Sequence, residues 1–546
     1  MTTSSELRAL LSKDEDLGTV LLRGDEFELE DVTVRAGGVV RPYPGRKPVI
    51  TGRNIVCNRN GMKVAGYDSG DFHVLDSDGR VLPVSSTKTL AANGSMHIMA
   101  ADVGKLDGKS RLVRMKLTDC PAELLGRSKE DLRNCTLKCS YWFLCFNVTG
   151  LYSDDRYVYG TVDNDRDYRF LAAYDPRPEI HLEFFNFPVG NNGAYIDNQD
   201  RLAGIPDGVG TVRVFYSSRL LILQGERSLT LEGLTFCGSR SPIILSYRDS
   251  RHKSIIDCAF RHCGSGIVCD NGVANYESDV QVSGCSFSEM YDNNCIMLEG
   301  CDNVTITGNK TYHTGLLNKG LCAISVSGRN FKVSDNDIRA FSYIGIRVGN
   351  TRDFGVENIS GEIRCNYIDN AENYGNPDAC LSDGGGIYVF THNDDTRVSY
   401  NVVCNNGFDN GWQRGIFLDD GAYNVRLTGN LVYHIWEEPV HARLVNGIER
   451  SGMNNEFRDN IFVGDCIIFG NPRGLGRKAL ICGNYIDGVV KTDPDHSTSL
   501  DNVSIRTEVC GGKLHIDIRA GIDKKKYPKF ILKHFYLTDD FISCTK

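Results

Sequence analysis

The stretch VTITGNKTY, residues 304–312, alternates apolar and polar side chains up to a Gly-Asn pair at Asn309. The same phrase returns as FKVSDNDI (331–338), IRCNYI (363–368), RVSYNVV (397–403), VRLTGNLV (425–432), FRDNIFV (457–463) and LICGNYI (480–486). A fixed core with variable inserts is typical of a solenoid. Alternation at period two predicts one short strand with a buried face in each copy. We therefore expect an all-β fold, a right-handed parallel β-helix.

The central Asn residues run from Asn309 to Asn484 at intervals of 24 to 35 residues. We expect them to stack in one column, because side-chain amides in register can bond from one coil to the next. Asn also tolerates the left-handed backbone conformation that a tight corner requires. Upstream the same phrase carries Leu234, Cys258 and Cys285 in place of Asn.

Size and charge exclude several classes of protein. A chain of 546 residues exceeds one ordinary globular core, whereas a solenoid escapes that limit because each repeat contacts mainly its neighbours. The net charge is −9, and the densest basic run, residues 524–526, reads as a solvated turn, so we expect no nucleic-acid partner. No apolar run reaches the roughly 18 residues of a membrane span.

The N-terminal residues 1–18 lack the apolar segment of a signal peptide. The compartment therefore stays open: cytoplasmic, or secreted or periplasmic if a signal was removed.

The 20 cysteines are spread thinly along the chain, which is unlike a disulfide framework. We expect several of them to face inward as small apolar residues. These are Cys258, Cys285, Cys295, Cys322, Cys365, Cys404 and Cys482. Cys135 and Cys139 have no matching second pair for zinc, and we expect no metal and no cofactor.

The repeat divides the chain into four parts. Residues 1–60 hold an amphipathic capping helix and the first coils. Between 61 and 216 the period is lost while strand-like runs continue, which predicts an inserted β-sandwich-like domain. Residues 217–488 form the main coils with a groove, and 489–546 form C-terminal capping strands.

A second strand in each coil allows the coils to be aligned. The strings are IVCDN (267–271), IMLEG (296–300), ISVSG (324–328), IRVGN (346–350), IYVFT (387–391) and IFLDD (416–420). The second and fourth positions face outward and stack about 4.8 Å apart on neighbouring coils. The outer second column reads Val268, Met297, Ser325, Arg347, Tyr388, Phe417 and His441. The outer fourth column reads Asp270, Glu299, Ser327, Gly349, Phe390 and Asp419. Aromatic rings beside carboxylates suit an oligo- or polysaccharide partner.

Two segments stand out from the repeat, SDGGGIY (382–388) and GIFLDDG (415–421). They resemble the paired motifs of β-helical glycoside hydrolases, closest to glycoside hydrolase family 141 and more distantly to family 120. RPYPGRKPVITG at 41–52 adds to the resemblance. It implies a pectate-lyase-like solenoid, a catalytic pair made of Asp383 and Asp419, and a fucoside- or xyloside-type linkage in a complex polysaccharide.

The chemistry of such a pair is reasonable, because glycosidic cleavage needs one carboxylic acid and one carboxylate. A shared groove separates their pKa values, and the three glycines after Asp383 leave room for a sugar ring. However, the alignment places Asp383 level with Trp412, seven residues before Asp419. The pair therefore requires the glycine segment to fold back over the groove. Otherwise the partner of Asp419 is another acid, Glu438 or Glu299.

We expect the remaining outward residues near the pair to bind substrate. These are Asp420, His441, Tyr388, Phe417, Arg347, Glu299, Trp412 and Glu438. Asp420 stands at a corner of the groove, and His441 is expected one coil beyond Phe417, beside Asp419.

Two other functions fit a β-helix. A polysaccharide lyase or epimerase would use a Lys or Arg base and often Ca²⁺; Arg347 and Arg443 face the groove, but no outward Lys stacks with them. A non-catalytic carbohydrate-binding or tail-fibre protein would often be a trimer, and no coiled coil is evident. The sequence leaves open the sugar, the anomeric outcome, the identity of the acid and the oligomeric state.

Overall fold

The computed structural model describes the chain in two compact units, Met1–Thr51 with Ser218–Lys546, and Gly52–Ser217. The described residues of the first unit are 1–51, 218–271, 276–292, 294–349, 359–376, 379–390, 393–409, 411–419, 422–443, 451–469, 478–493, 495, 497–510 and 513–538. Those of the second unit are 52–57, 144–162, residue 217 and short strands between 62 and 215.

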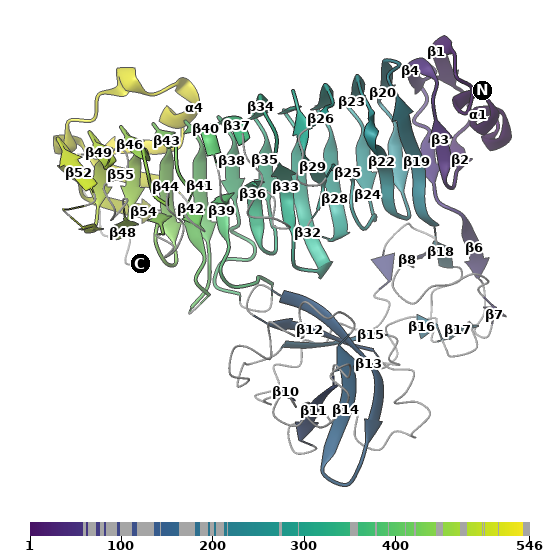
Figure 1. The fold of residues 1–546 in the computed structure, drawn as a ribbon, viewed down its shortest axis with the longest axis horizontal. Coiled ribbons are helices and arrows are strands. Elements are labelled where there is room, and N and C mark those ends of the chain that lie inside the picture. The colour runs from purple at the N-terminus through teal and green to yellow at the C-terminus, as the bar shows by residue number, and fades with distance from the viewer. Residues whose placement is uncertain are drawn as a thin grey trace. The chain divides into compact units, whose positions relative to one another are not determined.

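The first unit is a right-handed parallel β-helix, as predicted. Each coil gives one strand to each of three sheets, and Figure 1 shows these strands side by side in a long row. In the coil around Asn309, β31 (Thr305–Thr307) enters the first sheet, β32 (Lys310–Asn318) the third and β33 (Cys322–Val326) the second. Neighbouring strands within these sheets pair in parallel.

The first sheet has 13 strands, whose inward residues alternate with outward polar ones as the period-two pattern predicts. The strands are β1 (Asp16–Leu22), β4 (Gly37–Pro42), β20 (Leu229–Glu232), β23 (Lys253–Ile256), β27 (Val280–Ser283), β31, β34 (Phe331–Ser334), β37 (Ile359–Arg364), β40 (Asn393–Ser399), β43 (Val425–Thr428), β46 (Glu456–Arg458), β49 (Ala479–Cys482) and β52 (Ser497–Leu500).

The second sheet has 12 strands and carries the outward columns described above. The strands are β3 (Val32–Val34), β19 (Ser217–Gly225), β22 (Ser239–Ser250), β25 (Ile267–Asp270), β29 (Ile296–Glu299), β33, β36 (Ile344–Val348), β39 (Gly385–Phe390), β42 (Arg414–Asp419), β45 (Val440–Ala442), β48 (Cys466–Ile468) and β51 (Val490–Lys491).

The third sheet has 13 strands and ends at β53, so the coils extend past residue 488, where we expected the helix to end. The strands are β2 (Glu26–Glu28), β5 (Val49–Thr51), β21 (Thr235–Cys237), β24 (Ala259–Arg261), β28 (Ser286–Asp292), β32, β35 (Asp337–Arg339), β38 (Tyr367–Asp369), β41 (Val402–Asn406), β44 (Leu431–Ile435), β47 (Ile461–Val463), β50 (Tyr485–Asp487) and β53 (Val503–Ser504). A short two-stranded ladder, β26 (Tyr276–Glu277) with β30 (Cys301–Asp302), lies outside the three sheets.

The predicted Asn column is confirmed. The side-chain amide of Asn309 donates to Asn336 Oδ1 at 3.0 Å, and the backbone N–H of Asn309 donates to the same oxygen at 2.9 Å. The pattern repeats through every Asn to Asn484 and continues to Asn502. These amides are buried, so each ladder bond also satisfies a group that would be costly to leave unpaired.

Our second reason for Asn was wrong. The left-handed residue at each corner is the one before the Asn: a glycine in some coils, but Asp335 (φ 58°), Cys365 (φ 55°) and Tyr400 (φ 56°) in others. Asn309 and its equivalents do not have a positive φ. The ladder alone therefore explains the choice of Asn.

The N-terminal helix α1 (Ser4–Leu11) covers the first coil as predicted. Thr3 and Glu6 form a capping box, which satisfies free N–H groups at the start of the helix. Leu7 and Leu11 are fully buried in the main core, and Leu10 packs against it.

The cysteine prediction holds in part. Three of the cysteines that we expected inside, Cys258, Cys285 and Cys295, are in the main core. Cys365 and Cys482 are only half-buried at corners, and Cys322 and Cys404 belong to clusters outside the main core. The period-two pattern predicts which side of a strand a residue faces. It does not predict the burial of residues beyond the corner.

The C-terminal segment contains β54 (Thr507–Cys510), β55 (Lys513–Asp517), α4 (Lys529–Leu532) and β56 (Phe535–Thr538), with 3₁₀ turns at Ile518–Ala520 and Lys524–Lys526. Its apolar residues pack on outward side chains of the third sheet rather than on inward ones. The cluster comprises Ile505, Leu514, Ile516, Ile522, Tyr527, Ile531 and Phe535 with Val402, Cys404, Leu431, Tyr433, Ile461 and Tyr485. The segment thus covers a side of the helix, which differs from the terminal cap that we expected.

The second unit is built of antiparallel sheets. The largest has six strands in the order β10-β11-β14-β13-β12-β15, and the others have four strands (β6-β18-β8-β9) and three (β16-β17-β7). The strands are β6 (Asn54–Cys57), β7 (Met62–Lys63), β8 (His73–Asp76), β9 (Val81–Leu82), β10 (Met96–Ile98), β11 (Leu112–Lys116), β12 (Thr136–Tyr141), β13 (Leu144–Ser153), β14 (Tyr157–Val162), β15 (His181–Phe185), β16 (Tyr195–Ile196), β17 (Arg201–Ala203) and β18 (Val212–Phe215). A sandwich-like arrangement of this insert stays a prediction. Within the described ranges of both units, no helix has the length and apolar character to cross a membrane.

Candidate active site

The outer second column of the second sheet has the register that the sequence predicts. Strand pairing sets Arg347 of β36 beside Tyr388 of β39, then Phe417 of β42, then His441 of β45. In the fourth column, Phe390 pairs with Asp419. The alignment of short strings therefore gave the correct neighbours across four coils.

The aromatic residues of this column do not form the open sugar platform that we expected. Only 1 % of Phe417 and 6 % of Tyr388 is exposed. The guanidinium of Arg414 lies 4.3 Å from the centre of the Phe417 ring, and the Tyr388 ring meets Phe417 edge-on at 5.0 Å. Phe417 therefore supports the charged groups above it, and its ring faces are not available to a ligand.

One end of the column holds a buried ion pair, which we name the Glu299 cluster: Glu299, Ser325 and Arg347. Arg347 Nη2 contacts Glu299 Oε1, Ser325 Oγ donates to the same carboxylate oxygen at 2.7 Å, and Arg347 Nε donates to Ser325 Oγ at 3.1 Å. The exposed fractions of the Arg347 and Glu299 side chains are 8 % and 4 %. We expected both residues to bind substrate, but they neutralise each other inside the wall of the sheet.

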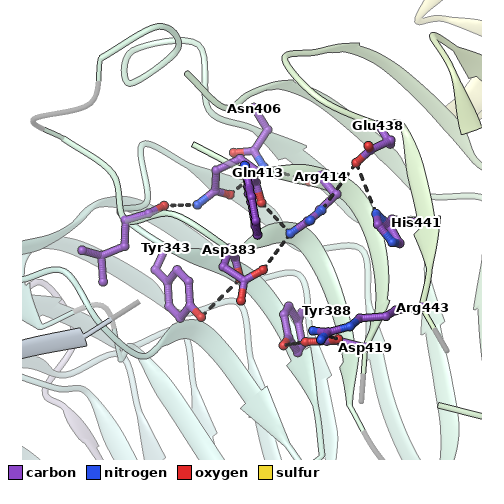
Figure 2. A network of polar contacts seen from close by, with 12 residues as sticks. Tyr343, Asp383, Tyr388, Asn406, Gln413, Arg414, Asp419, Glu438, His441 and Arg443 are labelled. Atoms are coloured by element: carbon purple, nitrogen blue, oxygen red, sulfur yellow. Dashed lines mark hydrogen bonds and ion pairs between the residues drawn. The ribbon is translucent and has the colours of Figure 1, made fainter. Parts of the chain in front are cut away.

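A second group of charged residues lies on β39, β42 and β45 and in the turns next to them (Figure 2). We name it the carboxylate network. Its members are Asp383, Tyr388, Arg414, Asp419, Glu438, His441 and Arg443.

Asp419 ends β42 and points to the outer face, with 5 % of its side chain exposed. Tyr388 Oη donates to Asp419 Oδ2 at 2.5 Å, and Arg443 Nη1 lies 3.4 Å from Asp419 Oδ1. Figure 2 shows the three side chains in one line. A hydroxyl and a cation on opposite oxygens hold this carboxylate in place.

Asp383 reaches the network because the chain turns at this residue. Its φ of 62° is left-handed, which an Asp adopts at the cost of some strain. The Asp383 N–H donates to the carbonyl of Gly411 on the next coil at 3.0 Å, and Tyr343 Oη donates to the Asp383 carbonyl at 3.3 Å. The side chain is then directed at Arg414, whose Nη1 donates to Asp383 Oδ1 at 2.8 Å.

Burial raises the pKa of Asp383 to about 6. The charge of Arg414 acts in the opposite direction, and the negative charge of Asp419 adds to the increase. The two aspartates therefore interact electrostatically, although the extended register places them seven residues apart. Near neutral pH, one carboxyl group holds its proton more strongly than a free Asp does.

Arg414 links Asp383 to two further residues. Arg414 Nε lies 3.5 Å from Glu438 Oε2, and the same oxygen lies 3.3 Å from His441 Nδ1. Burial acts to raise the pKa of Glu438, but the contacts with His441 and Arg414 lower it overall. We expected His441 beside Asp419; its register is correct, but its polar partner is Glu438.

The sequence reasoning missed Arg414. Its side chain is 9 % exposed, and its Nε makes a 3.5 Å ion-pair contact with Glu438 Oε2 that lacks hydrogen-bond geometry. A buried donor without a well-formed hydrogen bond is costly, so this N–H can also donate to a ligand oxygen. The signal was present, because Arg414 directly precedes the GIFLDDG motif.

The three glycines of the SDGGGIY motif have different roles. A Cβ on Gly384 would lie 2.6 Å from the Tyr343 carbonyl oxygen, and one on Gly386 would lie 2.3 Å from Val403 Cγ1. These two glycines are required by packing. Gly385 is less tightly packed, but a Cβ there would still lie 3.3 Å from the Arg414 carbonyl oxygen and 3.6 Å from Phe417 Cβ.

Two other predicted residues have different outcomes. Trp412 is 52 % exposed and lies beside Arg414, with 5.9 Å between the guanidinium carbon and the ring centre. Asp420 lies outside the described residues. Within the described ranges, no cluster of three or more His, Cys, Asp or Glu side chains could hold a metal ion.

A cavity of about 580 Å³ lies elsewhere, over β43, β46, β49 and β52 of the first sheet. It is lined by charges of both signs, and its carboxylate, Glu456, already accepts a hydrogen bond from Arg458 at 3.1 Å. Because it lacks a pair of interacting carboxylates, we place the candidate chemistry at Asp383 and Asp419.

Comparisons with known proteins agree with the fold. The family model for a right-handed β-helix region matches residues 271–462. No curated protein matches the sequence. A solved structure described as a glycoside hydrolase is 12 % identical, covers 96 % of this chain and 92 % of its own, and has a TM-score of 0.56.

Two weaker likenesses span other carbohydrate-active proteins. The structure of XylC with xylose is 10 % identical, with coverage of 92 % and 84 % and a TM-score of 0.44. The A-module of the mannuronan C-5 epimerase AlgE4 from Azotobacter vinelandii is 12 % identical, with coverage of 52 % and 80 % and a TM-score of 0.31. At these identities the likenesses concern the fold alone. The closer resemblance to families 141 and 120 stays a prediction.

Proposed function

We propose that the protein is a glycoside hydrolase that cleaves a fucoside- or xyloside-type bond in a complex polysaccharide with Asp383 and Asp419. The observation that carries the proposal is the carboxylate network. It brings together two carboxyl groups with different surroundings, one with its pKa raised to about 6 and the other held by a hydroxyl and a cation. Glycosidic cleavage needs that combination. The solved structure that covers nearly the whole chain is itself described as a glycoside hydrolase.

The surroundings assign different roles to the two groups. Asp383 is the general acid, which donates its proton to the leaving-group oxygen as the bond breaks. Asp419 is the carboxylate, which either attacks the anomeric carbon or takes a proton from the attacking water. The tyrosine hydroxyl of Tyr388 keeps one Asp419 oxygen fixed, so the other oxygen, which lies beside Arg443, faces the reacting sugar.

The remaining polar groups bind and orient the sugar. The Nε of Arg414, whose contact with Glu438 lacks hydrogen-bond geometry, can donate to a ring hydroxyl. The pair of Glu438 and His441 offers a second hydroxyl contact at 14–18 % exposure. Tyr388 and Phe417 form the floor below these groups.

The test is an assay for new reducing ends on polysaccharides with fucosyl or xylosyl side chains. The wild type should release the side-chain sugar, and Asp419→Asn should not. Asp337→Asn is a matched control, because Asp337 is also paired with an arginine, Arg339, but lies on the third sheet. A product that absorbs in the ultraviolet, formed without a new hydroxyl group, would assign the protein to the lyases and overturn the proposal.

A further inference from the structure

Two of the chain's three tryptophans, Trp412 and Trp436, are exposed beside the carboxylate network. The exposed fraction is 52 % for Trp412 and 42 % for Trp436. Trp412 lies in the turn two residues before Arg414, whereas Trp436 lies two residues before Glu438 and is level with Gly407 of the preceding coil. The N–H of Gly415 donates to the Glu438 carbonyl at 3.0 Å, which sets Arg414 beside Glu438 on neighbouring coils. Two exposed indoles next to a reactive site are unlike scattered surface aromatics.

Contacts fix the Trp436 ring and the Trp412 backbone. The Trp436 ring centre lies 5.5 Å from that of Tyr374, and a Cβ on Gly407 would lie 2.7 Å from the Trp436 Cβ. Trp412 has a left-handed φ of 50°, unusual for a bulky residue, and its carbonyl accepts a hydrogen bond from Arg414 Nη1 at 2.7 Å. Backbone strain of this kind is kept where surrounding contacts fix a functional group. Each indole therefore presents a fixed apolar surface to solvent.

The contacts of Trp412 show on which side of the scissile bond these rings lie. The same Arg414 Nη1 donates to the Trp412 carbonyl and to Asp383 Oδ1, and the Asp383 N–H bonds to the residue before Trp412. Trp412 therefore belongs to the Asp383 side of the network. Trp436 is connected to it through the adjacent Glu437, whose carboxylate accepts a hydrogen bond from the Trp412 N–H. Because the general acid protonates the leaving-group oxygen, its neighbours contact the leaving-group sugar.

The charge around the two rings indicates what kind of sugar fits. The Glu437 carboxylate accepts a hydrogen bond from the Trp412 backbone N–H, and the charges of Glu438, Arg414 and Asp409 act on it. Burial raises the pKa of Glu437 and the Glu438 charge raises it further, whereas the Arg414 charge acts in the opposite direction. Three acidic side chains around one arginine leave an excess of negative charge, which disfavours an anionic ligand. They suit the hydroxyl donors of an uncharged sugar.

We propose that Trp412, Trp436 and Glu437 form the subsite for the leaving-group sugar and that this sugar is a neutral pyranose rather than a uronic acid. The apolar C–H faces of the pyranose contact the exposed indoles, and its hydroxyls bond to Glu437. The inference rests on the proposed hydrolase function and adds the class of leaving group that the site accepts.

The first experiment compares two substrates with the same reacting sugar. One is an oligosaccharide, either a xylo-oligosaccharide or a fucosylated xyloglucan fragment. The other is the matching xylosyl or fucosyl fluoride, which has no leaving-group sugar. Trp436→Ala and Trp412→Ala should lower kcat/KM on the oligosaccharide by about tenfold more than on the fluoride. Trp436→Phe should recover part of the loss, and unchanged melting temperatures should exclude misfolding.

Tyr247→Ala provides the matched control, because Tyr247 is 59 % exposed on β22 of the same sheet, far from the network in the coil order. It should leave both substrates unaffected. Equal losses on the oligosaccharide and the fluoride in the tryptophan variants would overturn the subsite. That result is distinct from failure of the proposed function, which would appear as normal hydrolysis by Asp419→Asn.

The second experiment tests the charge preference by direct binding. The non-hydrolysing Asp419→Asn variant is titrated with a neutral xylo-oligosaccharide and with one that carries glucuronic acid at the leaving-group position. The neutral ligand should bind about tenfold more tightly than the acidic one. Adding Glu437→Gln should reduce this difference in Kd between the two ligands. Tighter binding of the acidic ligand would contradict the neutral-sugar assignment.

Discussion

The Glu299 cluster and the carboxylate network occupy corresponding outward positions of one sheet, but their charged groups are paired differently. In the Glu299 cluster one acid meets one base, a serine completes the contacts, and both charged side chains are at least nine-tenths buried. A closed pair of this type has no capacity left for a ligand. The sheet alone therefore does not create a functional site. The residues at its outward positions determine whether one forms.

The carboxylate network has three acids, Asp383, Asp419 and Glu438, but only two arginines. Arg414 is shared between Asp383 and Glu438, and Asp419 relies on the half-exposed Arg443. The result is a carboxyl group with a raised pKa and a guanidinium N–H that makes an ion-pair contact but no well-formed hydrogen bond. Perturbed groups of this kind are typical of functional sites. The predictions below test whether the two clusters differ in function as they differ in composition.

The largest expected effect is that of Asp419→Asn on turnover. Replacing the carboxylate by an amide keeps its shape and removes its charge, so kcat should fall by about 10³-fold or more, on the order of 4 kcal/mol. Rates of sugar release, with melting temperatures as the folding control, provide the measurement. Turnover near the wild-type value would show that the network is not the catalytic centre.

Asp383→Asn should lower kcat on oligosaccharides by about 10²- to 10⁴-fold, the usual contribution of a general acid. On a glycosyl fluoride, whose leaving group needs no proton, most of the activity should remain. An equal loss on both substrates would exclude the role of acid.

The pH profile of the wild type provides an independent check of that role. The acid must be protonated to act, and burial raises the pKa of Asp383 to about 6. The rate kcat/KM should therefore be retained below pH 6 and fall as the pH rises through that value. A kcat/KM profile that stays flat from pH 5 to 8 would contradict the assignment of Asp383 as the acid, because a group with a pKa of about 6 loses its proton within that range.

Glu299→Gln should have the opposite effect: the free energy of unfolding should fall, and kcat should be retained. Removing one partner of a buried ion pair leaves Arg347 uncompensated, at a cost of about 3–5 kcal/mol in the free energy of unfolding. Urea denaturation measures the loss, and kcat at a temperature where the variant stays folded should be within about twofold of the wild type. A large fall in kcat with unchanged stability would move the Glu299 cluster into the active site.

The smallest effect is expected for His441→Ala. His441 contacts Glu438 and not Asp419, so its loss should weaken sugar binding and lower kcat/KM by about tenfold. Steady-state kinetics over a range of substrate concentrations separates this from an effect on kcat alone. Identical kinetics to the wild type would remove His441 from the site.

Much of this architecture could be predicted from the sequence, because a solenoid converts sequence spacing directly into neighbours in space. The Asn ladder and the order of Arg347, Tyr388, Phe417 and His441 follow from alternation and spacing alone. Register decides which side chains face outward. It does not decide what covers them.

The errors share that cause. Phe417 was expected to be open, but the long Arg414 side chain folds over its ring. Asp383 was expected to need a folded-back glycine segment, whereas a single left-handed residue, Asp383 itself, redirects the chain. Cys404 was expected inside, but it packs under the C-terminal segment, which has no repeat to locate it. A period-two pattern does not predict rotamers, corner conformations or contacts between residues distant in sequence.

The most direct test of the central claim, that Asp383 and Asp419 act as one interacting pair, needs no knowledge of the substrate. The carboxyl carbon of Asp383 can be followed by ¹³C NMR titration in the wild type and in Asp419→Asn. The account predicts that Asp383 titrates at a pKa of about 6 in the wild type and at a lower pKa in the variant, because the Asp419 charge is removed. An unshifted Asp383 that titrates like a free aspartate in both proteins would contradict the account.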